Sequence, residues 1–230
     1  AKREVVGRYR GSAMGLMWSF FNPVLMLAVY TFVFSFVFKA RWAGGSESRT
    51  EFALVLFVGL LVFNLFSECV NRAPGLILSN VNYVKKVIFP LEILPLVVLG
   101  SAAFHFGISF SVWLIFYLIF FGLPPATIFW LPLTLLPLLL LTLGLSWLLA
   151  SLGVYLRDVS QIIGVVTTIL MFVSPIFYPI SALPEKYHSF IQLSPLTLVV
   201  EQARNAMIWG HSIDWLPWSI SIVVASIVAW

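Results

Sequence analysis

Charged residues are scarce in this chain of 230 residues. Only 10% of the residues are charged and 61% are hydrophobic, whereas an average globular protein has about 25% charged and about 45–50% apolar residues. Thirteen Lys and Arg and nine Asp and Glu cannot cover the surface of a folded chain of this size, so we expect lipid to be most of its solvent. The composition therefore excludes a soluble enzyme, a nucleic-acid-binding domain and a disordered tail.

Residues that bind metals or nucleotides are also few. Cys69 is the only cysteine, which excludes an internal disulfide and a CxxC metal site. None of the three histidines, His105, His188 and His211, has a second His or a Cys at helical spacing. No Gly-Lys pair occurs, so the chain has no Walker A motif, and an ATPase that drives it must be another chain or domain. We therefore expect no catalytic residue, metal or cofactor in this chain.

Long apolar runs dominate what the sequence does contain. A helix that crosses about 30 Å of hydrocarbon needs about 20 apolar residues. Six runs meet or approach that length, at residues 22–38, 52–67, 91–121, 126–155, 159–180 and 215–230. The third and fourth have no charged turn at their middle, so each is predicted to be one long or tilted helix, separated by Gly122-Leu123-Pro124-Pro125. The predicted fold is an all-α membrane protein with six transmembrane helices, the sixth cut short at the end of the sequence.

The distribution of basic residues predicts the orientation. Eight of them lie on the side of the N-terminus: Lys2, Arg3, Arg8, Arg10, Arg72, Lys85, Lys86 and Arg157. Five lie on the other side: Lys39, Arg41, Arg49, Lys186 and Arg204. Because basic residues favour the cytoplasmic side, both termini are expected to be cytoplasmic, and the net charge of +4 is expected to face membrane lipid rather than nucleic acid.

Residues 2–21 form an amphipathic segment ahead of the first span. Its apolar residues make one helical stripe, which consists of Val5, Tyr9, Ala13, Leu16 and Phe20. Arg8 and Arg10 lie beside this stripe, where their side chains can reach lipid headgroups. The segment is predicted either to be only an interfacial anchor or to use these arginines for binding as well.

Residues 71–90 form the longest cytoplasmic loop. Ile77, Val81 and Val84 make a short apolar stripe, with Lys85 and Lys86 on other faces. About five residues would suffice to reconnect two helices. The extra length indicates either a docking surface for a soluble partner or a helix that lies flat on the bilayer.

Residues 181–214 form a long external segment with two predicted short helices. One begins near Pro184-Glu185-Lys186, and the other follows Ser194-Pro195, which is typical of an N-cap and a proline at the first helical position. The second helix has Leu196 and Val200 on one side and Glu201 and Arg204 on another. Its apolar content is too high for a free loop, so we expect it to re-enter the outer leaflet as a plug, a gate or a packed lid.

Two polar features lie within or beside the later spans. His105 is the one titratable residue well inside a predicted span, and such residues mark functional sites. Small residues on and beside its helical face, such as Ala102 and Gly107, are also typical of a close helix contact with one interhelical hydrogen bond, which we favour. Arg157 and Asp158, between the fourth and fifth spans, are expected to cap helix ends.

Four stretches of the sequence point together to one family. The first is Arg8-Tyr9-Arg10-Gly11-Ser12 with Gly15-Leu16, Trp18 and Asn22-Pro23. The others are Lys85-Lys86-Val87-Ile88-Phe89-Pro90-Leu91-Glu92-Ile93-Leu94-Pro95, Tyr155-Leu156-Arg157-Asp158-Val159-Ser160-Gln161 and Ser174-Pro175-Ile176-Phe177-Tyr178-Pro179. In this order they resemble ABC-2-type transporter permeases that export polysaccharides, such as O-antigen, capsule and teichoic acid. One departure is Ser194-Pro195, where the family is expected to have Asn-Pro.

The resemblance implies a half-transporter of the type V exporter architecture in the bacterial inner membrane. Two copies would form the pore, and two copies of a separate ATP-binding subunit, which bind ATP and Mg, would dock on the cytoplasmic loops. Residues 2–21 would be the interface helix, 71–90 the coupling-helix loop and 181–214 the external gate helices. The substrate would be a glycan on polyprenyl pyrophosphate, with an O-antigen of the lipopolysaccharide type as first choice.

Specific residues follow from this resemblance. Arg8, Tyr9 and Arg10 are candidates for binding the lipid pyrophosphate. The candidates for contact with the ATPase are Ile77, Val81, Val84, Lys85 and Lys86. One alternative is an ABC-2 exporter of drugs or lipids. Another is a membrane-embedded polyprenyl-phosphate glycosyltransferase, which would need clustered acidic residues. The acidic residues expected on the cytoplasmic side are Glu4, Glu68, Glu92 and Asp158, and they lie on different segments of the chain.

Overall fold

The fold is known from a computed structural model that describes residues 17–33, 49–80 and 90–230. Within these ranges all the regular elements are helical, as the predicted all-α fold requires. The longer helices are α2 (Met17–Tyr30), α3 (Arg49–Arg72), α6 (Ile93–Phe121), α7 (Leu131–Tyr155), α8 (Val159–Val173), α10 (Pro195–Arg204) and α11 (Trp215–Ala229). The shorter ones are η2 (Ala73–Gly75), α4 (Leu76–Ser79), η3 (Ala126–Trp130), η4 (Ile180–Ala182), α9 (Glu185–Gln192) and the π-helical turn η5 (Asn205–Trp209).

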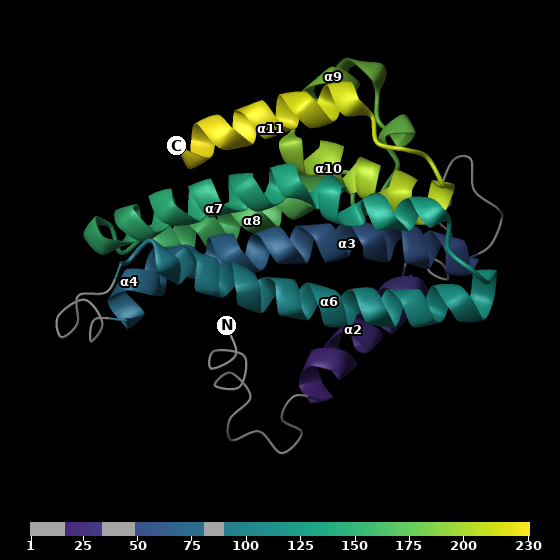
Figure 1. Cartoon of the computed structure of the whole chain (residues 1–230), viewed down its shortest axis with the longest axis horizontal. Coiled ribbons are helices and arrows are strands. Elements are labelled where there is room, and N and C mark those ends of the chain that lie inside the picture. The colour runs from purple at the N-terminus through teal and green to yellow at the C-terminus, as the bar shows by residue number, and fades with distance from the viewer. Residues whose placement is uncertain (1–16, 34–48, 81–89) are drawn as a thin grey trace.

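Helix α3 lies at the centre of the molecule. It packs against α6, α7, α8 and α10, and Figure 1 shows α6 and α7 running beside it along the long axis, with α11 on the outer side of α7. Its most apolar stretch is 83% buried, whereas that of α6 is 11% buried. A helix that is hydrophobic on all sides must have either protein or lipid around it. For α3 the surroundings are mostly protein, and the outer side of α6 is left for lipid.

Three helical stretches are long and apolar enough to cross a membrane. They are Thr50–Ser79, Ile93–Phe121 and Ala126–Tyr155, and three shorter apolar helices are Met17–Val33, Val159–Val173 and Trp215–Ala229. The second and third long stretches each run without interruption, as expected from their uncharged middles. Between them, Gly122 is the C-cap of α6 and Pro125 the N-cap of η3, at the predicted helix breaker.

Several helix ends differ from the ends of the apolar runs. The described part of α2 runs from Met17 past Asn22, so the described end of the predicted 2–21 segment belongs to the same helix as the first span. Helix α3 continues to Arg72, beyond the predicted end at Ser67. Glu68 and Asn71 do not end it, because helix spacing places polar residues on one side while the other side stays buried.

Helix α8 ends at Val173, short of the predicted end at 180. Ser174 is extended, with a ψ of 145°, and Pro175 follows it. A residue before proline is disfavoured in the helical conformation, which explains the early end. The two predicted external helices are present as α9 and α10, and α10 begins at Pro195 with Ser194 in the N-cap position.

Candidate functional site

Arg204, the last residue of α10, is completely buried. Its Nε donates to the carbonyl oxygen of Val55 in α3 at 3.2 Å, and its Nη2 donates to that of Ile176 at 2.9 Å. Its Nη1 donates to the Pro175 carbonyl oxygen and to the Glu201 carboxylate, both at 2.7 Å. Three of these acceptors are backbone atoms of α3 and of the turn after α8, so Arg204 ties α10 to both.

This position corrects the expected arrangement of α10. The pair between Glu201 and Arg204 forms, but Arg204 does not lie away from the apolar residues. It points into the protein, as do Leu196 and Val200, which are also buried. The physical reason is that the turn after α8 leaves carbonyl oxygens without helical partners, and the guanidinium supplies donors for them. Helical spacing within α10 could not reveal this, because the acceptors lie in distant segments.

Gly59 makes room for the Arg204 side chain. A Cβ at Gly59 would lie 2.8 Å from Arg204 Nη2 and 3.3 Å from Ile176 Cγ2. Gly59 also lies one helical turn after Val55, so its missing side chain leaves the Val55 carbonyl accessible to the guanidinium. Burial lowers the pKa of Arg204, and the adjacent Glu201 carboxylate opposes this shift. Arginine stays protonated in proteins, so the junction carries a charge.

A second polar group joins α3 to α6. The Nδ1 of His105 lies 2.9 Å and 3.1 Å from the two carboxylate oxygens of Glu68, and Arg72 Nη1 lies 3.5 Å from one of them. His105 therefore takes part in an interhelical contact. Of the small residues predicted to pack there, Ala102 is buried in a cluster with Leu65 and Cys69 of α3. Gly107 is exposed instead, and an added Cβ there would meet nothing within 4 Å.

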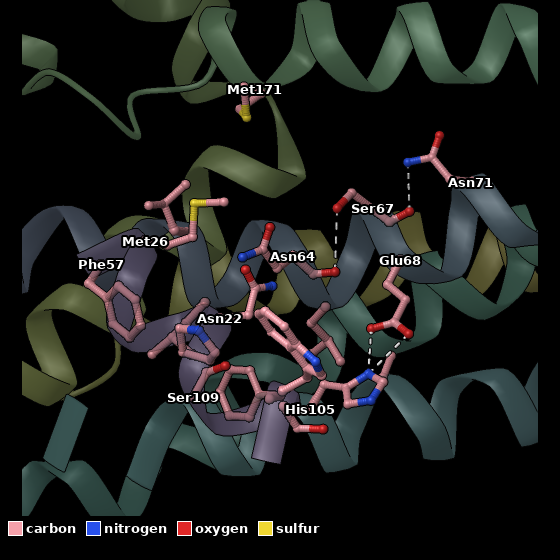
Figure 2. Close-up of a pocket in the computed structure, with 18 of the residues that line it drawn as sticks. Asn22, Met26, Phe57, Asn64, Ser67, Glu68, Asn71, His105, Ser109 and Met171 are labelled. Carbon is pink, nitrogen blue, oxygen red and sulfur yellow. Dashed lines mark hydrogen bonds and ion pairs between the residues drawn. The ribbon is translucent and has the colours of Figure 1, made fainter. Parts of the chain in front are cut away.

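A cavity of about 460 Å³ lies beside this pair, with walls from α2, α3 and α6 (Figure 2). Its polar residues include Asn22 of α2, Asn64 and Asn71 of α3, and Ser109 of α6. Asn71 Oδ1 accepts a hydrogen bond of 3.1 Å from Thr167 of α8. The sequence did contain a signal for this site, since Asn64, Glu68 and Asn71 recur at helical spacing on one face of an apolar helix.

Arg157 and Asp158 are exposed between α7 and α8. Asp158 occupies the N-cap position of α8, but its side chain makes no capping hydrogen bond. Its carbonyl oxygen instead accepts hydrogen bonds of 3.0 Å from the N–H groups of Gln161 and Ile162. The expected side-chain cap is therefore not formed at Asp158, and these bonds are the first backbone bonds of the helix.

The predicted cytoplasmic docking segment is described only at its start. Ile77 is half-buried in α4, and the neighbouring Leu78 is 46% exposed. The other predicted contact residues and the three pyrophosphate candidates lie outside the described residues: Val81, Val84, Lys85, Lys86, Arg8, Tyr9 and Arg10. Within the described ranges, no group of three or more His, Cys, Asp or Glu could hold a metal ion.

Known proteins resemble this chain over most of its length. The O-antigen export system permease protein RfbA of Myxococcus xanthus is 28% identical over 231 residues, covering 100% of this chain and 86% of the relative. The polysialic acid transport protein KpsM of Escherichia coli is 24% identical over 91% of this chain and 80% of its own length. The capsule polysaccharide export inner-membrane protein CtrC of Neisseria meningitidis serogroup B is 25% identical over 95% of this chain and 81% of its own length. The profile of the family described as ABC-2 type transporter matches residues 1–208, so the chain belongs to the ABC-2 type transporter family.

Proposed function

We propose that this chain is the transmembrane subunit of an ATP-driven exporter. Its substrate is a polysaccharide linked to polyprenyl pyrophosphate, with an O-antigen of the lipopolysaccharide type as first choice. The exporter moves this substrate from the cytoplasm across the bacterial inner membrane. The observation that carries this proposal is the similarity to O-antigen, polysialic acid and capsule exporters over 91–100% of the chain.

The proposed assembly is a homodimer in which each chain crosses the membrane six times. The three long and three shorter apolar helices supply six spans, and both termini are cytoplasmic. The dimer is supported by the outer faces of α2 and α8, where Val29 is 52% and Ile162 58% exposed in the single chain. Such faces suit contact with lipid or with a second copy.

Two copies of an ATP-binding subunit complete the transporter and bind ATP and Mg. They dock on residues 71–90, where Leu78 already offers an exposed apolar side chain. Arg8, Arg10 and Tyr9 receive the lipid pyrophosphate, because a guanidinium can form two parallel hydrogen bonds with phosphate oxygens. Residues 181–214 form the external gate, and their attachment to α3 through Arg204 supports movement of α10 together with the core.

The alternatives have less support. An ABC-2 exporter of drugs or lipids would fit the family but not the named functions of these relatives. A membrane-embedded glycosyltransferase would need a carboxylate cluster for a metal diphosphate. Glu68 instead contacts His105 and Arg72, and Glu92 and Asp158 lie on other segments.

Deletion and complementation in the source bacterium test the proposal. Deleting the gene should abolish the surface polysaccharide and cause lipid-linked glycan to accumulate on the cytoplasmic side. The full-length protein should restore export, but not when the partner ATPase carries an alanine in place of its Walker A lysine. Surface polysaccharide that persists after the deletion would contradict the proposed substrate.

A paired substitution tests the pyrophosphate candidates separately. Arg8→Lys/Arg10→Lys keeps both charges but loses the planar fork, whereas Arg8→Gln/Arg10→Gln loses both. If the arginines bind pyrophosphate, the lysine pair should already reduce glycan-stimulated ATP hydrolysis, with basal hydrolysis retained. Normal stimulation in the lysine pair would show that these residues only anchor the membrane.

A further inference from the structure

The cavity between α2, α3 and α6 has the size of a small-molecule site. Its volume of about 460 Å³ lies within the range of about 300–1,000 Å³ that is typical of ligand pockets. Figure 2 shows Asn22, Asn64 and Ser109 around its centre, with the Glu68–His105 pair at one end. The described residues that line it all belong to one chain.

Ser19 contributes a buried hydroxyl that is not hydrogen-bonded. Its side chain is 7% exposed, it lines the cavity, and no partner for its Oγ exists in the described part of the chain. Buried polar atoms almost always have a hydrogen-bond partner, so this hydroxyl needs an explanation. One helical turn later stands Pro23, which has no N–H for the Ser19 carbonyl oxygen. On the α2 wall of the cavity, the hydroxyl and the carbonyl oxygen of Ser19 can therefore form hydrogen bonds that the helix itself does not use.

Two amides on different helices add to this capacity. Asn22 of α2 and Asn64 of α3 both line the cavity, both are exposed in the single chain, and no hydrogen bond joins either amide group to another described residue. Each amide offers two donor hydrogens and one acceptor oxygen with two lone pairs. Polar side chains on apolar helices are costly unless they meet a partner, so a ligand with several hydroxyl groups would suit both walls.

The remaining wall chemistry favours a neutral ligand. Four aromatic rings, those of Trp18, Tyr30, Phe57 and Phe106, line the same cavity and offer flat apolar surfaces. Among the described lining residues, the acidic Glu68 and the basic Arg72 lie 3.5 Å apart, so their charges balance. An isolated phosphate would meet the Glu68 carboxylate, whereas a sugar ring offers hydroxyls to the amides and C–H faces to the rings.

We infer that this cavity binds one neutral sugar residue of the exported glycan, with Ser19, Asn22 and Asn64 as hydrogen-bonding residues. The inference rests on the proposed function and adds to it a recognition site for the glycan in each chain. The sugar residue binds to the wall formed by α2 and α3, and the pyrophosphate binds to other residues.

Binding to the complete complex tests the inference. The chain and its ATPase are placed in nanodiscs of phosphatidylethanolamine and phosphatidylglycerol, because sugar-based detergents would compete. The probes are oligosaccharides released by mild acid from the source cell's own surface polysaccharide, and inorganic pyrophosphate, each measured by calorimetric titration. The parent complex should bind the oligosaccharides, and pyrophosphate should not displace them.

The variants give the decisive comparison. Asn22→Leu and Asn64→Leu should each weaken oligosaccharide binding by about 3- to 10-fold, the loss expected for one hydrogen bond. Gln192→Leu, which changes an exposed amide of α9 outside the cavity, should bind as the parent does. Ser19→Ala should raise the Tm of the empty complex, by removing an unsatisfied hydroxyl, and yet weaken binding. A merely structural serine would not give these opposite effects.

Separate outcomes distinguish this inference from the proposed function. If the parent exports glycan but binds no oligosaccharide, or if both asparagine variants bind normally, the assignment of the cavity is wrong and the function stands. Displacement by pyrophosphate alone would also overturn it, in favour of an anion site. If the parent complex restores no polysaccharide export in the deletion strain, the proposed function itself is wrong.

Discussion

The Arg204 side chain occupies the space beside Gly59, so a residue larger than glycine at position 59 should destabilise the protein. In Gly59→Ala the new Cβ would lie 2.8 Å from Arg204 Nη2, and the guanidinium cannot move without losing its carbonyl partners. Overpacking of this kind costs about 1–3 kcal/mol, so we expect a lower Tm of the purified protein in nanodiscs. Gly107→Ala is the matched control, because nothing lies within 4 Å of the new atom. An equal loss of Tm in both variants would contradict the close packing at Gly59.

Arg204 is expected to tolerate no replacement by lysine. Arg204→Lys keeps the charge but replaces a planar fork by three donors on one nitrogen, so the acceptors on Val55, Pro175 and Ile176 cannot all be reached. A buried polar group left without a partner costs about 1–3 kcal/mol, and a lower Tm should report that loss. Arg157→Lys, at an exposed position, should leave Tm unchanged. Parent-like stability of Arg204→Lys would show that the charge alone is sufficient.

At the scale of whole elements, α4 and the residues after it are expected to bind the ATPase. In Ile77→Asp/Val81→Asp, two carboxylates enter the proposed apolar contact, and burying them would cost more than the contact provides. We expect the ATPase to be lost from pull-downs while the permease still inserts in the membrane. Ser79→Asp, on the same short helix but already polar, is the control. Unchanged co-purification in the double variant would contradict the docking site.

The helices themselves were largely predictable from the sequence, whereas their contacts were not. The apolar runs located the long stretches at 93–121 and 126–155, because length and uncharged composition are local properties. The end of α3 was missed, since Glu68 and Asn71 lie on a polar face of a helix that continues. The cavity and the Arg204 junction depend on pairs such as Val55 and Arg204, which are far apart in the chain, and no local pattern encodes such pairs.

At the scale of the whole molecule, the single chain has a large apolar surface. Exposed apolar side chains occur along α2, α6, α8 and α11, and they include Val29, Ile119, Val165 and Ile227. We expect two copies of this chain and two ATPase subunits in the purified complex, because the proposed pore lies between copies. Mass photometry in nanodiscs should give the mass of this 2:2 assembly. A complex with one copy of each subunit would contradict the proposed homodimer.

The central position of α3 also has a consequence for biosynthesis. Translation completes α3 before α6 and α8, so Glu68 and Asn71 gain their partners His105 and Thr167 only as those later helices insert. Arg204 arrives last of these partners. A nascent chain halted before that residue leaves the carbonyl oxygens of Pro175 and Ile176 without their guanidinium donors. Such an unfinished chain should be retained by insertion chaperones and degraded by membrane quality-control proteases.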